Sequence, residues 1–131
     1  MILVDTSVLI DYFRGIENEK TARFRSILED NTPFGINDFI YLELLQGCRT
    51  DKDYRLLKEY LDTQHFYNLK NGRESYARAA RIFFDLRSSG QTVTSSIDCL
   101  IAQTAIENNL LLLHNDADFS RIRKVAPLKE L

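Results

Sequence analysis

Two short runs made only of apolar residues, Met1–Val4 and Leu110–Leu113, constrain the fold of this chain more than any other feature. A strand that is apolar at every position is typical of a parallel sheet that helices cover on both faces. Helical patterns of roughly ten to fifteen residues lie between the short apolar runs, which indicates βαβ units. We therefore predict an α/β fold with a central, mostly parallel twisted sheet of about five short strands flanked by helices.

The expected elements follow from periodicity, capping residues and turn signals. The clearest amphipathic helix lies between Glu74 and Ser88, where Tyr76, Ala79, Ala80 and Phe83 recur at helical spacing. The predicted strands cover residues 1–4, 34–36, 66–69 and 110–113, with a last short strand near Val125. The predicted helices cover residues 6–13, 20–28, 54–61, 74–88 and 95–109; a further helix capped by Asn37 or Asp38 runs to Gly47, and a brief helix starts at Ala117.

Length and composition predict one domain over residues 1–131, because a domain has roughly 150 residues and no linker or repeat is visible. The net charge of −2 argues against a protein that grips long nucleic acid through bulk positive charge, but it leaves room for a small basic cleft. The opening apolar run is too short for a signal peptide or a membrane span, so we expect a cytoplasmic protein without membrane contact. Cys48 and Cys99 lack metal-ligand spacing and are expected to be free thiols.

Acidic residues stand where such a fold places its ligands. In open α/β sheets the site lies beyond the carboxyl ends of the strands. Asp5 follows the first apolar run and Asp116 follows the second, so both should project from one sheet edge; Asp118 lies two residues further on. Asp98 heads a helical stripe of small and apolar residues, where an unpaired charge is costly. Glu43 lies on a leucine-rich helix, on a line that continues into polar residues.

Each acid also has a purely structural explanation. Asp5 suits the cap of the helix that starts at Thr6, and Asp98 completes a capping box with Ser95. Glu43 suits a solvated helix face, and the segment 115–118 has ordinary turn chemistry. His114 at a strand end is more typical of a structural than of a catalytic histidine.

The chemistry of a shared acidic site calls for a cation. Two carboxylates about 4 Å apart repel by about 4 kcal/mol at an effective dielectric constant near 20, which would destabilise the fold without compensation. Oxygen donors without a His or Cys cluster select Mg²⁺, or Mn²⁺, over zinc or copper. The sequence shows no obvious Ser–His–acid set or phosphate-binding glycine loop, which disfavours covalent and P-loop chemistry.

Four segments in order carry a family resemblance that spans the whole chain: V-D-T-S at residues 4–7, Y-L-E-L-L-Q-G at 41–47, S-x-x-D-x-x-I-A at 95–102 and L-L-L-H-N-D-A-D-F at 111–119. The sequence resembles the PIN domain, specifically the VapC-type bacterial toxin ribonucleases. One departure is His114, where the family often has Thr.

This resemblance implies a set of site residues. The family's catalytic acidic quartet falls on Asp5, Glu43, Asp98 and Asp116, and Asp5, Asp98 and Asp116 would hold the metal. Glu43 would orient the attacking water, and Thr6 would orient Asp5 through its hydroxyl. Asp118 would support the ligands without binding the ion, although Asp116 and Asp118 both remain open as the fourth acid.

The resemblance further implies a Mg²⁺-dependent endoribonuclease, the toxin of a VapBC-type toxin–antitoxin pair, with RNA as substrate, a VapB-type antitoxin as partner and a homodimeric assembly. The alternative is a catalytically silent PIN-like RNA-binding or interaction domain. The candidate phosphate contacts, each also explained as a solvated surface charge, are Arg14, Arg49, Lys52, Arg87, Arg121 and Arg123.

Overall fold

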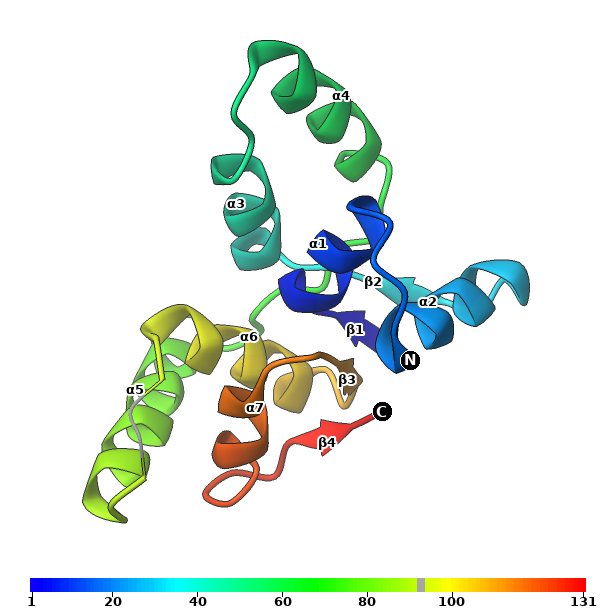
Figure 1. Ribbon diagram of the computed structural model, residues 1–131. Helices are drawn as coiled ribbons and strands as arrows, with labels where there is room; N and C mark the ends of the chain where they lie inside the picture. Colours follow the sequence, from blue (N-terminus) through cyan, green and yellow to red (C-terminus); the bar gives the residue numbers. More distant parts are fainter. Residues whose placement is uncertain (92–93) are drawn as a thin grey trace.

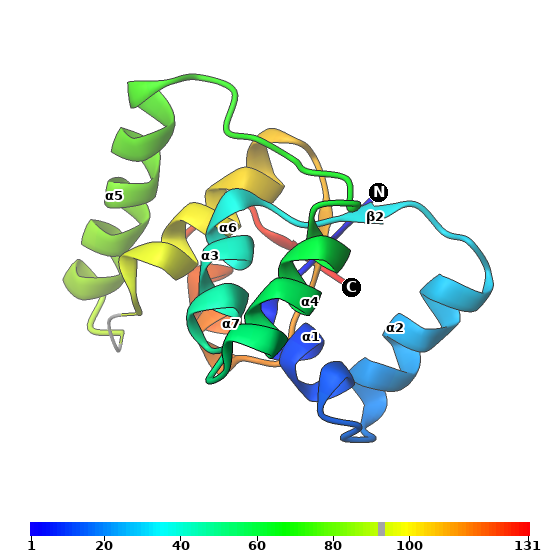
Figure 2. The same cartoon turned by 90° about the horizontal axis from the view of Figure 1, so that it is seen from above.

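The computed structural model describes residues 1–91 and 94–131 and places a small sheet between two groups of helices (Figure 1). The elements in chain order are β1 (Ile2–Val4), α1 (Thr6–Phe13), α2 (Glu19–Glu29), β2 (Phe34–Gly35), α3 (Asp38–Gln46), α4 (Asp51–Leu61), α5 (Arg73–Ser88), α6 (Ser96–Glu107), β3 (Leu111–Leu113), α7 (Ala117–Ile122) and β4 (Lys129–Glu130). Helix α1 contacts α2 and α3, whereas α5, α6 and α7 contact one another. Figure 2 shows α2 and α5 at opposite ends of the molecule.

All the paired strands run parallel, in the order β2-β1-β3-β4. The two central strands are the apolar runs of the sequence, and Val4 pairs with Leu113 at their carboxyl ends. Leu3, Val4, Leu112 and Leu113 are completely buried. This confirms a parallel sheet whose central strands are covered on both faces.

The sheet of the described residues has four strands rather than about five, and two of the expected positions were wrong. The strand expected over residues 66–69 is a single parallel bridge between Ile36 and Phe66. It ends there because the next backbone groups bond to the end of α6: the Asn108 amide donates to the Asn68 carbonyl, and the Lys70 N–H donates to Glu107. The last strand lies at Lys129–Glu130, not near Val125.

A glycine allows the bridge segment to lie against β2. A Cβ atom added at Gly35 would lie 2.6 Å from the carbonyl oxygen of His65 and 2.7 Å from the ring of Tyr67. Only a residue without a side chain accepts this approach of two backbone segments. Any larger residue would push the bridge away from the sheet.

The sheet brings the ends of β1 and β3 together. The Asp5 N–H donates to the Leu113 carbonyl at 2.9 Å, so the residues that follow the two strands are neighbours in space. Helix α3 contacts both α1 and α6, which adds side chains from two further elements to the same edge. Within residues 1–91 and 94–131, none of the helices combines the length and apolar character that a membrane crossing requires.

Candidate metal centre

Asp5 forms the buried floor of the site and also caps α1. One carboxylate oxygen, Oδ2, accepts hydrogen bonds from the backbone N–H of Ser7 at 2.9 Å and from its hydroxyl at 2.6 Å. The residue is only 4% exposed. Burial, together with the nearby negative charges of Glu43 and Asp98, outweighs these hydrogen bonds and raises the pKa of Asp5 to about 6. The capping explanation and the site explanation therefore both apply to this residue.

Ser7 is a residue that the sequence analysis missed. Its hydroxyl donates to Asp5 and accepts the backbone N–H of Asn115 at 2.9 Å. It thus links the acid after β1 to the turn after β3. The only sequence signal for this role is that Ser7 stands two residues after Asp5, where a capping carboxylate finds its partner.

Thr6 does not orient Asp5, contrary to the expectation. Its hydroxyl donates to Glu43 Oε1 at 2.9 Å and so reaches from α1 to α3. In the first turn of α1 the side chain of Ser7, not that of Thr6, turns back toward the cap. Ser7 therefore orients Asp5, and Thr6 orients Glu43.

Glu43 is half-buried on α3, and its contact with Thr6 and its electrostatic interaction with Asp98 and Asp116 place it at the site. Burial is the main cause that raises its pKa, and the charges of Asp98 and Asp116 add to the effect; the Thr6 hydrogen bond opposes it. Because Oε1 accepts the Thr6 hydroxyl, the side chain has a defined orientation. A carboxylate held in this way is suited to bind a water and to accept its proton.

Asp98 lies in the first turn of α6, where Ser95 caps the helix by accepting the Asp98 N–H at 3.1 Å. Its carboxylate accepts a short hydrogen bond of 2.5 Å from the buried Thr94 hydroxyl. Burial raises the pKa of Asp98, as do the charges of Asp116 and Asp118. The cap explains the position of the backbone, but it does not explain why a carboxylate is half-buried among other acids.

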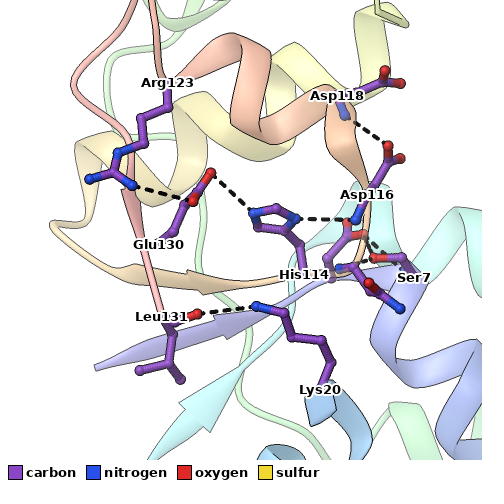
Figure 3. Close-up of polar contacts among 10 residues, drawn as sticks. Ser7, Lys20, His114, Asp116, Asp118, Arg123, Glu130 and Leu131 are labelled. Carbon is purple, nitrogen blue, oxygen red and sulfur yellow. Dashed lines mark hydrogen bonds and ion pairs between the residues drawn. The ribbon is translucent and has the colours of Figure 1, made fainter. Parts of the chain in front are cut away.

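Asp116 and Asp118 belong to the turn that enters α7. Asp116 caps this helix by accepting the Asp118 N–H at 2.9 Å, and Asp118 forms an ion pair with Arg121 (Figure 3 shows the two acids). Carboxylate oxygens of Asp98, Asp116 and Asp118 all lie within 4.8 Å of one another. Asp5 is not a member of this trio, but the charge of Asp98 contributes to the raised pKa of Asp5.

The donor chemistry fits a hard divalent cation. The charges of neighbouring acids raise the pKa values of Asp5, Glu43 and Asp98, and the oxygens of three acids in the described residues can reach one ion. The acids are partly buried, which makes their mutual repulsion costly without a cation. Carboxylates with room for water are the ligands that Mg²⁺ prefers.

His114 is buried beside the site, and burial lowers its pKa. Its ring accepts the Asp116 N–H and faces Glu130 of β4, so it is part of the structure around the acids. The expected structural role is thus observed, with a partner in Glu130 that the sequence did not suggest.

The candidate phosphate contacts are scattered, and of those described here Arg121 contacts an acid of the site. Arg121 pairs with Asp118 and Arg123 with Glu130, whereas Arg87 stacks on Phe83 with 5.6 Å between the guanidinium and the ring centroid. Arg14 and Arg49 line a separate groove with apolar residues of α1, α3 and α4. Lys52, in the first turn of α4, is exposed.

Comparison with known proteins agrees with this geometry. The family model described as "PIN domain" matches residues 2–125. VapC ribonuclease Mb1587 of Mycobacterium bovis and Ribonuclease VapC11 of Mycobacterium tuberculosis are each 32% identical over 130 residues, which is 98% of this chain and 96% of theirs.

Solved structures share the fold. VapBC2 from Rickettsia felis, bound to a DNA fragment from its promoter, is similar over 100% of this chain and 98% of the other, with a TM-score of 0.75 and 19% identity. VapBC-1 from nontypeable Haemophilus influenzae gives a TM-score of 0.73 with 22% identity over 100% of this chain and 97% of the other.

Proposed function

The chain belongs to the PIN domain family, and we propose that it is a metal-dependent endoribonuclease that acts as the toxin of a VapBC-type toxin–antitoxin pair. One observation carries the proposal. Carboxylates from four separate parts of the chain converge beyond the carboxyl ends of β1 and β3, where neighbouring negative charges raise the pKa values of Asp5, Glu43 and Asp98. Nothing in packing alone favours such a concentration of negative charge.

The ion is assigned to Asp5, Asp98 and Asp116, with Mg²⁺ as the first candidate and Mn²⁺ as the second. Asp118 engages Arg121 and serves the site mainly by capping contacts with Asp116. When bound, such an ion favours deprotonation of an attacking water and neutralises charge on the phosphodiester. Thr6 holds Glu43 in place, and Glu43 orients the water and accepts its proton.

The substrate and the partner are assigned from the relatives. Relatives that align over nearly their full length bear the name ribonuclease, and structures with the same fold come from VapBC complexes. We assign RNA as the substrate, a VapB-type antitoxin as the protein partner and a homodimer as the assembly. The net charge of −2 is consistent with recognition of a short region of RNA rather than with binding along a long nucleic acid through positive charge.

The test is cleavage of RNA by the purified protein with Mg²⁺, with Mn²⁺ and with EDTA, followed by mapping of the new ends. We expect new ends only with a divalent cation, and none in Asp5→Asn or Asp98→Asn. Glu17→Gln, which removes one exposed charge from the loop before α2, is the matched control and should cleave as the wild type does. RNA binding with no metal-dependent cleavage would instead support the catalytically silent alternative.

A further inference from the structure

The ring of His114 connects the metal-binding turn to the C-terminal strand. Its Nδ1 accepts the backbone N–H of Asp116 at 3.2 Å, and its Nε2 lies 3.2 Å from Glu130 Oε1 (Figure 3). The side chain is 7% exposed, and the ring packs against buried Phe119 with 5.0 Å between centroids. The ring therefore has little freedom to turn away from these two contacts.

The two contacts define one tautomer. A nitrogen that accepts a hydrogen bond carries no proton, so Nδ1 is bare and Nε2 carries the hydrogen of the neutral ring. Nε2 lies 3.2 Å from Oε1 of Glu130, a buried carboxylate oxygen that has no hydrogen-bond partner within the described residues. A buried acceptor without a hydrogen-bond partner is costly, and the contact with the ring nitrogen offsets part of this cost electrostatically.

Glu130 is itself held in place. Its Oε2 lies 3.4 Å from Nη1 of Arg123, and its strand pairs with β3 through Leu112. The next residue, Leu131, donates its N–H to the Leu112 carbonyl at 3.0 Å. A strand paired with β3 thus supports the histidine from the side opposite to the acids.

We infer that His114 is a positioning residue for the metal centre. Its ring connects the backbone N–H of Asp116 to Glu130 of β4 and so fixes the backbone of Asp116. The inference rests on the proposed function only in taking Asp116 as a ligand. Removal of a residue that hydrogen-bonds to a metal ligand commonly lowers metal affinity or activity by about 10- to 100-fold. The expected consequence is a loss of metal affinity without a loss of the catalytic groups.

The test measures Mn²⁺ binding by calorimetry on the whole chain, in the absence of RNA. His114→Ala removes both contacts and should weaken Mn²⁺ binding by about tenfold. His114→Asn offers an acceptor that can take the N–H two residues on, as in an Asx turn, and should recover most of the affinity. Nitrogen NMR of the wild-type ring should report a bare Nδ1 and a protonated Nε2, with or without the ion.

Thr104→Val is the control for general destabilisation, because it removes a buried hydrogen bond between α6 and Asn37 away from the acids. It should lower the melting temperature and leave Mn²⁺ affinity unchanged. Unchanged affinity in His114→Ala would overturn the inference, as would equal losses in His114→Ala and His114→Asn.

The proposed nuclease can fail separately. Wild-type protein that binds Mn²⁺ and responds to these variants, but cuts no RNA, would leave the positioning role intact and remove the nuclease. Metal-dependent RNA cleavage by the wild type, together with normal Mn²⁺ affinity in His114→Ala, would support the nuclease and remove the positioning role.

Discussion

Thr6 and Glu43, 37 residues apart in the chain, are joined by a hydrogen bond of 2.9 Å in which the threonine hydroxyl donates to Oε1 of the glutamate. The bond links the first turn of α1 to the middle of α3. It fixes one oxygen of Glu43 and leaves the other for a ligand, so the orientation of the proposed water-binding group depends on a residue that does not touch the ion.

Thr6→Val should therefore lower kcat without lowering the affinity for the metal ion. The substitution keeps the volume and the branched shape and removes only the donor. We expect kcat for RNA cleavage to fall by about tenfold or more, because a general base loses its orientation. Calorimetric Mn²⁺ affinity should stay at the wild-type value. Thr6→Ser keeps the hydroxyl and should restore kcat; if it fails to do so, the hydrogen bond is not the cause.

Ser7→Ala should destabilise the fold and weaken metal binding together. It removes the 2.6 Å hydrogen bond to Asp5 and the acceptor for the Asn115 N–H. Loss of a largely buried polar contact costs about 1–3 kcal/mol, to be measured as the free energy of unfolding in urea. The pKa of Asp5 should rise further, because the lost hydrogen bond favours the charged carboxylate. Ser120→Ala, at an exposed position of α7, is the control and should change neither quantity.

The fold was largely predictable because its signals are local. Two uninterrupted apolar runs identify the central parallel strands, and capping residues set the start of α1 directly after Asp5. The strand expected at residues 66–69 was wrong for a reason that no local pattern carries. Its backbone groups find partners on α6, and the choice between strand and loop is made by tertiary packing.

The site was predictable in its acids and less so in the residues that hold them. Position after a strand or at a helix start identifies Asp5, Asp98 and Asp116 as candidates, and their roles stay predictions. Spacing cannot tell which of two adjacent hydroxyls, Thr6 or Ser7, turns toward which carboxylate. For Glu43, a polar line along the helix suggests solvent, and only the packing of α3 against α1 and α6 places it at the acids.

The metal-free protein should lose stability as the pH rises from about 4 to about 7. The pKa of Asp5 is about 6 in the folded chain and 3.8 as its ordinary value. Between these values the folded chain binds more protons than the unfolded chain, so the free energy of unfolding falls as the pH increases. This difference in pKa corresponds to a destabilisation of about 3 kcal/mol, which is complete once the pH is above the folded pKa.

Asp5→Asn isolates this contribution, because its amide oxygen can still accept both Ser7 hydrogen bonds. At pH 7.5 without metal, Asp5→Asn should unfold at a higher urea concentration than the wild type, and the two should converge near pH 4. Saturating Mg²⁺ should stabilise the wild type alone, by about 3 kcal/mol at 100 times Kd. A wild type that is as stable as Asp5→Asn at pH 7.5 without metal would contradict the buried-charge argument.

Arg121→Ala should make the acids bind a cation more tightly. Arg121 pairs with Asp118, which lies within reach of Asp98 and Asp116, and so it neutralises part of the charge that an ion would meet. Because the pair is partly exposed, its worth is at most about 1 kcal/mol, which corresponds to about a fivefold decrease in the Kd for Mn²⁺. Calorimetry with Arg121→Lys, which keeps the charge and loses the fork of donors, should give a value nearer to the wild type. Weaker Mn²⁺ binding in Arg121→Ala would mean that the arginine holds Asp118 in the geometry the ion needs, rather than competing with the ion for it.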